Sequence, residues 1–232
     1  MNPKRPSKPR GRRPAVQDFD LREHLLDTAT QLFAERGIAA TTVAQIAVGA
    51  GVTSALVHYY FMNRETLLDA VADERLTPAM QFVWGWKVDD ATNDPFAMVQ
   101  EIVGRLFDVT ERMPWLPPLW LREIVNEGGL LRERMMKRIP IDNIGRFAGH
   151  IAHAQQDGTV NTELEAALLF NSVLAVVMLP LATAKIWQSL RGIPAIEPDA
   201  MRRHATALLM GGMQPPARAA RKARRASSRD KP

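Results

Sequence analysis

The sequence predicts an all-α protein. Apolar residues recur at three- and four-residue spacing along most of the chain, and capping residues or proline and glycine breakers separate these stretches. No stretch has the sustained period-2 alternation of a half-buried strand, and no internal repeat is present. With 232 residues, the chain is long enough for a small helical domain followed by a larger helical bundle.

Three helices are predicted near the N-terminus. The first covers residues 21–37. The second begins at the capping pair Thr41 and Thr42, and the third restarts at Thr53. Gly49 and Gly51 supply the flexible backbone between them. The apolar residues expected to form the core of this unit are Leu25, Ala29, Leu32, Phe33, Val43, Ile46, Ala47, Val52, Val57, Phe61 and Leu67.

The third of these helices carries more large side chains than one core can bury. Leu56, Val57, Tyr60 and Phe61 cannot all face inward on a single helix, so some of them are presented to a partner. Two short helices joined by a Gly-Val turn are typical of a helix-turn-helix. In such a motif the second helix enters a groove of DNA.

Residues 19–72 resemble the tetracycline-repressor (TetR) family of transcription regulators. The shared pattern is Leu-Phe, Gly, Thr-Thr, Ile-Ala, Ala-Gly-Val, Tyr-x-Phe and a basic residue before Leu-Leu. The sequence departs from it at His58, where the family usually has Tyr, and at Met62, where Lys is common. The resemblance implies a DNA-binding regulator.

The resemblance also implies how the DNA-binding residues divide their roles. Residues 54–56 and His58 would face base edges, whereas Thr42, Tyr59, Tyr60 and Arg64 would hold phosphates. Arg64 is the only full charge on this helix and the turn after it, so part of the phosphate affinity must come from elsewhere. The complete set expected to contact DNA is Arg10, Arg12, Arg13, Thr42, Thr53, Ser54, Ala55, Leu56, His58, Tyr59, Tyr60 and Arg64.

Positive charge is concentrated at the two ends of the chain. Residues 1–17 and residues 215–232 each carry a net charge of +6, so the body between them carries −7 within a total of +5. Basic arms at chain ends most often meet phosphate, and Arg10, Arg12 and Arg13 suit a narrow minor groove. Solvated tails without a role in DNA binding are the alternative for both arms.

Caps and breakers predict the helices of the larger body. Asn63 caps a helix that continues to about Trp84, and Asp94 with Pro95 opens one that ends near Arg112. Prolines then enforce a break. Thr162 with Glu165 forms a capping box in front of a long apolar helix. The remaining helices are expected over residues 119–125, 130–138, 141–156, 162–190 and 198–210.

The long apolar helix has two interpretations. Residues 166–184 are nineteen residues without a charge, which is close to the length of a membrane span. Asn171, Ser172 and Pro180 weaken that interpretation, and a helix apolar on most faces is also typical of a dimer interface or a large core. We expect no membrane association.

The resemblance implies that the larger body binds a small molecule and forms a homodimer. An interior rich in Trp and Met suits an aromatic or aliphatic ligand, although plain core packing explains the same residues. The expected ligand-binding residues are Trp84, Trp86, Phe107, Trp115, Trp120, Phe147, Ile151 and Phe170. The expected dimer interface, on the last two helices, comprises Leu168, Val173, Leu174, Val177, Leu181 and Leu208.

Enzymatic motifs are absent from the sequence. There is no Cys, G-x-S-x-G, phosphate-binding glycine loop or H-E-x-x-H. His150 and His153 lie three residues apart on one expected helix and could share a metal ion, but ordinary surface or hydrogen-bonded histidines are the simpler interpretation. We therefore expect no catalytic residue, no metal and no cofactor.

Together these observations predict a cytoplasmic, homodimeric transcription regulator. We expect a repressor that binds a palindromic double-stranded DNA operator and is released by a small apolar or aromatic effector. The expected organisation is a basic arm over 1–17, a DNA-binding domain over 18–64, a ligand-binding and dimerisation domain over 65–212, and a basic tail over 213–232. The alternative is a helical small-molecule-binding protein or enzyme with a vestigial helix-turn-helix.

Overall fold

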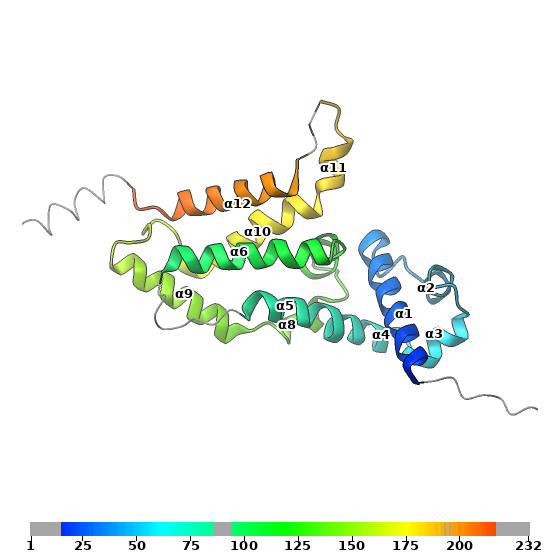
Figure 1. The fold of residues 1–232 in the computed structure, drawn as a ribbon. Helices are drawn as coiled ribbons and strands as arrows, with labels where there is room; N and C mark the ends of the chain where they lie inside the picture. The colour runs from blue at the N-terminus through cyan, green and yellow to red at the C-terminus, as the bar shows by residue number, and fades with distance from the viewer. Residues whose placement is uncertain (1–14, 86–93, 193, 195, 217–232) are drawn as a thin grey trace, which may run out of the picture.

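Helices are the regular elements throughout the described part of the chain, as predicted. The structure is a computed structural model that describes residues 15–85, 94–192, 194 and 196–216. A small group of helices lies at one end of the molecule, and a layered bundle forms the rest (Figure 1). The small group comprises α1 (Ala15–Arg36), α2 (Val43–Gly49), α3 (Ser54–Phe61) and α4 (Arg64–Val71).

The chain enters the bundle without an intervening loop. Helix α4 continues into a π-helical turn, η1 (Ala72–Leu76), and then into α5 (Thr77–Trp84). The linking residues Val71, Ala72 and Leu76 all have right-handed helical backbone angles. Helix α4 and the wall of the bundle are therefore parts of one continuous helical segment.

The bundle is built from the helices that follow α5. Helix α6 packs between α5 and α12, and α10 packs against α9, α6 and α7 (Figure 1). The bounds of these elements are α6 (Pro95–Arg112), α7 (Leu116–Trp120), η2 (Leu121–Val125), α8 (Arg132–Met136), α9 (Ile141–Gln156), α10 (Ala166–Ala182), α11 (Ala184–Ser189) and α12 (Pro198–Met213).

Several sequence-predicted boundaries are confirmed. The Asn63 side chain accepts a hydrogen bond from Thr66 N at 2.9 Å at the start of α4. The Asp94 side chain accepts from Phe96 N at 2.9 Å at the start of α6, which ends at Arg112 as expected. Helix α9 has the predicted bounds. Helix α7 begins earlier than expected, at Leu116, because two prolines fit its first turn, where their missing N–H groups are not needed.

The predicted start of the long apolar helix at Thr162 is wrong. Helix α10 begins at Ala166, and Glu165 is its N-cap. Contacts with neighbouring helices hold the preceding turn out of helical geometry. Asn161 N donates to Met213 O at 2.9 Å, and Gln155 Nε2 donates to the carbonyls of Asn161 and Leu164 at 2.9 and 2.7 Å.

The predicted continuous helix to Leu190 is also interrupted. Helix α10 ends at Ala182, and α11 starts afresh at Ala184. Pro180 lies in the last turn of α10 and has no N–H to continue the hydrogen-bond ladder. The last helix, α12, extends to Met213 instead of Met210, whereas α8 is shorter than the predicted 130–138.

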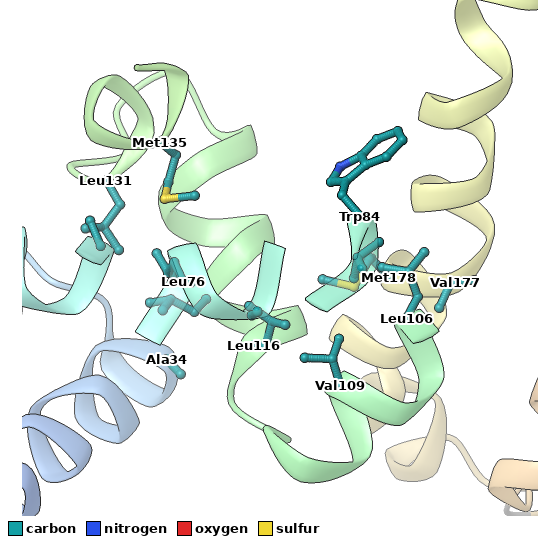
Figure 2. Packing of buried hydrophobic residues seen from close by; sticks show 14 of the residues in the cluster. Ala34, Leu76, Trp84, Leu106, Val109, Leu116, Leu131, Met135, Val177 and Met178 are labelled. Atoms are coloured by element: carbon teal, nitrogen blue, oxygen red, sulfur yellow. The ribbon is translucent and has the colours of Figure 1, made fainter. Parts of the chain in front are cut away.

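One apolar core runs through both parts of the molecule. Ala34 of α1, Leu76 of η1 and Leu116 of α7 lie in the same neighbourhood, with Val109, Met178 and Trp84 further along (Figure 2). Because burial of apolar surface drives packing, this continuity fixes the small helical group against the bundle.

Gly129, in the turn between η2 and α8, is required by close backbone packing. A Cβ at this position would lie 2.2 Å from Glu123 O, whereas a Cβ at Gly128 would meet nothing within 4 Å. We expect Gly129→Ala to lower the free energy of unfolding by about 1–3 kcal/mol through this clash. Urea titration monitored by circular dichroism measures the effect, with Gly128→Ala as the matched control. Equal stability of the two variants would contradict the packing described for this turn.

Candidate DNA-binding surface and ligand cavity

Helix α2 is fixed by reciprocal hydrogen bonds at its start. The Thr42 hydroxyl accepts from Gln45 N at 3.2 Å, and Gln45 Oε1 accepts from Thr42 N at 2.8 Å. These two bonds form a capping box. The turn after α2 passes through Gly51, whose φ of +67° is strained for residues with a Cβ, and Val52 N then donates to Ala47 O at 2.9 Å. The predicted helix-turn-helix geometry is therefore present.

Helix α3 buries one face and exposes the other. Val57 and Phe61 are buried in the core, while residues 53–55 and His58 are exposed and Tyr59 is 73% exposed. Leu56 and Tyr60 are half-buried. The ring of Tyr59 meets that of Tyr60 edge-on, with 5.1 Å between centroids. The exposed face thus combines hydroxyls, a methyl, an imidazole and a phenol, which suits contact with base edges and phosphates.

His58 is oriented by the backbone that follows its helix. Its Nδ1 lies 3.2 Å from Met62 O. Since a carbonyl can only accept, Nδ1 carries the proton in this contact, and Nε2 is the acceptor when the ring is neutral. Met62 itself has a φ of +48°, the one positive value at a non-glycine residue within the described ranges.

Arg64 does not project toward solvent as a phosphate contact would. Its guanidinium donates to Thr41 O at 3.1 Å and also to Ile38 O. Arg64 therefore binds the connection between α1 and α2, and the expected phosphate contact is corrected to this structural role. Thr42 is exposed although its side chain caps α2. Arg10, Arg12 and Arg13 lie outside the described residues.

A cavity of about 440 Å³ lies inside the bundle, within the size range of small-molecule sites. Of the expected ligand-binding residues, Trp84, Trp120 and Phe170 line this cavity, and the centroids of the Trp84 and Phe170 rings are 4.5 Å apart. Figure 2 shows Trp84, Leu106, Val109 and Met178 together at this part of the core. Val125 and Met136 also line the cavity and are exposed, so it reaches the surface near them.

Four other expected ligand residues do not line the cavity. Phe147 is buried behind it, with its ring 6.4 Å from Trp84 and 6.3 Å from Phe170 between centroids. Ile151 is buried, Trp115 precedes α7, and Phe107 is covered by the guanidinium of Arg202 at 5.2 Å. These residues pack the core, the alternative that the sequence left open. Trp86 lies outside the described residues.

Sequence reasoning missed much of the cavity wall. It predicted helices over 119–125 and 130–138 but did not assign η2 and α8 to the ligand site, although Arg132, Met135, Met136 and Ile139 repeat at helical spacing. That spacing was the available signal. Which helix face turns toward a cavity depends on tertiary packing, so the pattern alone did not distinguish wall from core.

Comparisons with known proteins agree with this geometry. Residues 25–71 match the family model described as bacterial regulatory proteins of the tetR family. The chain is 34% identical over 101 residues to the HTH-type transcriptional repressor KstR2 of Mycobacterium tuberculosis, covering 43% of this chain and 48% of that protein. The repressor BepR of Brucella suis is 26% identical over 170 residues, covering 72% of this chain and 81% of BepR. The N-terminal part of the chain is therefore similar to the DNA-binding region of TetR-family regulators.

The similarity in fold extends beyond the matched N-terminal region. The structure of the ketosteroid transcriptional regulator KstR2 of Mycobacterium tuberculosis superposes with a TM-score of 0.64 at 20% identity, covering 83% of this chain and 94% of that one. The fatty acid degradation regulator FadR of Bacillus halodurans gives 0.62 at 19% identity, covering 83% and 95%. At these identities the likeness establishes the TetR fold alone. In sequence, the match spans about half the length of KstR2.

A buried carboxyl group joins the two parts of the molecule. Glu123 of η2 is 5% exposed. Its Oε1 accepts from Ile38 N of the DNA-binding unit at 2.9 Å, and its Oε2 accepts from Leu130 N before α8 at 3.2 Å. Its neighbours Trp120, Ile124 and Val125 line the cavity. One short element therefore touches both candidate sites.

Ion pairs also connect the small helical group to the bundle. On one side, Arg22 donates to both carboxylate oxygens of Glu74 at 2.6 Å, and Arg75 binds Glu23 and Asp27. The hydrogen bonds from Arg22 are the main cause that lowers the pKa of Glu74 below its ordinary value, and those to Glu74 likewise raise the pKa of Arg22. On the other side, α8 is tied to α4 and η1. The pairs there are Arg134 with Glu65 and Asp69, and Arg138 with Asp73.

The expected dimer residues divide between surface and core. Leu168 and Leu208 are 57% and 55% exposed and are available to a second copy of the chain. Val173 and Val177 are fully buried within the protomer, so their assignment to the interface is wrong: they point into the core of their own bundle. Leu174 lines the cavity, and Leu181 is half-buried.

The remaining side chains give no sign of metal chemistry or membrane insertion within the described ranges. His153 lies 3.5 Å from Asp157, one helical turn later, and no group of three or more potential metal ligands occurs among these residues. No described helix is both long and apolar enough to cross a bilayer. The similar proteins named above are regulators and not enzymes, in agreement with the absence of catalytic motifs.

The Glu74 contact predicts a pH-dependent contribution to stability. Because folding lowers the pKa of Glu74, its contribution is present above the ordinary value of 4.5 and is lost as the pH falls through the folded-state value. We expect Glu74→Gln to lower the free energy of unfolding by up to ~1 kcal/mol at neutral pH, with a smaller difference in acid. Urea titrations at neutral and acidic pH measure it, with exposed Glu111→Gln as control. A difference that grows in acid would contradict the assignment.

Proposed function

We propose that this protein is a homodimeric transcriptional repressor that binds a palindromic operator through α2 and α3 and is released by a small apolar ligand. The observation that carries the proposal is the double role of η2 and α8. Both elements line the cavity, and both are bonded to the DNA-binding unit. The match of residues 25–71 to the TetR family model and the similarity to named repressors support the same function.

The proposed DNA contacts come from the exposed face of α3 and from the starts of two helices. Residues 53–55, Leu56 and His58 are assigned to base edges, and Thr42, Tyr59 and Tyr60 to phosphates. Because Arg64 is bound to backbone carbonyls, the phosphate contacts are assigned to helix N-termini and to the basic arm that contains Arg10, Arg12 and Arg13.

We place the subunit interface on the outward faces of α10 and α12. Leu168, Ser172, Ala175 and Leu179 are exposed and recur at spacings of four and three residues along α10. Leu208 is exposed on α12, which packs against α10. A twofold pairing of these faces would present two copies of α3 to successive major grooves, ~34 Å apart.

The proposed release is a shift between two arrangements of the dimer. A ligand that fills the cavity presses on η2 and α8, and these elements carry the change to α1 through Glu123 and to α4 through Arg134. A coupling of about 1–3 kcal/mol changes operator affinity by about 5- to 150-fold. Such a change is sufficient for induction.

The DNA-binding part of the proposal is tested by a mobility-shift titration on the DNA that flanks the gene. We expect the wild type to form a competitor-resistant complex and His58→Ala/Tyr59→Ala to bind at least about tenfold more weakly, because each base or phosphate contact contributes ~1–3 kcal/mol. Ile141→Ala removes an exposed side chain from α9 and serves as the control. Weak, salt-labile binding that is equal in all three proteins would instead favour a ligand-binding protein or enzyme with a vestigial helix-turn-helix.

The coupling part is tested at Glu123. A Gln at this position has one acceptor for two backbone donors, so one N–H is left unsatisfied at a cost of about 1–3 kcal/mol. We expect Glu123→Gln to unfold in two stages in urea, because one of the two backbone hydrogen bonds that Glu123 accepts between the DNA-binding unit and the bundle is lost. Tryptophan fluorescence follows the bundle, where Trp84 and Trp120 lie, and circular dichroism follows all helices.

The exposed Glu133→Gln is the matched control for this experiment. Wild type and control should each give coincident transitions by both probes. Coincident transitions in Glu123→Gln as well, at unchanged stability, would remove Glu123 from the proposed coupling.

A further inference from the structure

The cavity contains a polar feature that an apolar ligand alone does not explain. Twenty of the 22 described residues in its wall are apolar, and the two polar ones are Arg132 and Asn171. No Asp or Glu belongs to the wall among the residues that the structure describes. A cation in a mostly apolar cavity is desolvated in part, and electrostatic interactions there are stronger than in bulk water.

Arg132 differs from Arg134 of the same helix and from Arg138, which lies just after α8. Arg134 binds Glu65 and Asp69, and Arg138 binds Asp73, so each of those guanidinium groups already has a carboxylate. The half-buried Arg132 side chain makes no hydrogen bond or ion pair with any other residue that the structure describes. Its guanidinium keeps its full set of donors for another group.

We infer that the natural ligand is an apolar monocarboxylate whose carboxylate binds Arg132 and whose aliphatic or aromatic body occupies the apolar part of the cavity. This inference rests on the proposed ligand-binding function and specifies the ligand class. A planar guanidinium matches a carboxylate with two parallel hydrogen bonds, and the amide of Asn171 is a further donor in the wall. Trp84, Phe170 and Met178 provide surface for the apolar body.

The position of Arg132 also connects ligand charge to DNA binding. Arg132, Met135 and Met136 line the cavity from α8. Arg134 holds this short helix to α4, and Arg138, just after it, binds Asp73 of η1. A carboxylate on Arg132 therefore binds a helix whose opposite side is attached to the unit that carries α3. The ligand's charge contributes to release as well as to affinity.

The test uses one apolar chain with three different ends. The neutral dye N-phenylnaphthylamine, which fluoresces in apolar surroundings, is bound to the full-length protein and displaced by decanoate, decanol or decylammonium at neutral pH. In the wild type we expect decanoate to displace the dye at about tenfold lower concentration than decanol. Decylammonium is expected to be the weakest of the three, because the wall offers it a cation and no acid.

Variants assign the preference to one side chain. Arg132→Gln should bring decanoate and decanol within about twofold of each other, and Arg132→Lys should keep part of the preference. Lys137→Gln, which removes an exposed cation of the same segment outside the cavity wall, should behave as the wild type. Leu174→Trp fills part of the cavity and should weaken binding of the dye. This result verifies that the dye reports on this cavity.

The outcomes separate this inference from the proposed function. Equal displacement by decanoate and decanol in the wild type, or a preference for decanoate that persists in Arg132→Gln, would overturn the inference that Arg132 selects an anion. In either case, dye binding that Leu174→Trp weakens would still support an apolar ligand site. Dye binding that Leu174→Trp leaves unchanged, together with no displacement by any of the three amphiphiles, would overturn both.

Discussion

The buried carboxyl group of Glu123 is the contact on which the proposed mechanism depends. It accepts one backbone N–H from the turn after α1 and another from the turn before α8, so a single side chain satisfies donors from both parts of the molecule. Buried polar groups are costly unless they are paired, and these two bonds therefore define one arrangement of the parts. Gly129 allows the backbone to approach Glu123 closely enough for that arrangement.

Apolar packing and surface charge act around this contact in different ways. The continuous core from α1 to α10 provides most of the favourable free energy, but it is not directional. The ion pairs of Arg22, Arg75, Arg134 and Arg138 are partly exposed and contribute little stability individually. They do fix how the helices are oriented relative to one another, because they connect α1 with η1 and the α8 segment with α4 and η1. A ligand that moves α8 then has a defined path to the DNA-binding unit.

The cavity and the contact between the two parts are built from the same elements, which is the physical basis for the proposed regulation. Trp120, Ile124 and Val125 face the cavity, while Glu123 between them faces the DNA-binding unit. Irregular helices such as η1 and η2 change the face that a helix presents, and they frequently occur at functional sites. Both lie between the cavity and the small helical group. A change of packing at the cavity would therefore alter the packing against the small helical group.

The sequence by itself determined the all-α class, the helix-turn-helix over residues 41–61, and the caps at Thr42, Asn63 and Asp94, because capping and helical periodicity are local properties. Only the tertiary structure decided which apolar residues line a cavity and which fill a core. Phe147, Phe170, Val173 and Leu174 are all apolar residues of helices, but only Phe170 and Leu174 face the cavity. It also decided that Arg64 binds backbone carbonyls and that Arg132 faces the cavity. The partners of a long charged side chain are distant in sequence, and no local pattern encodes them.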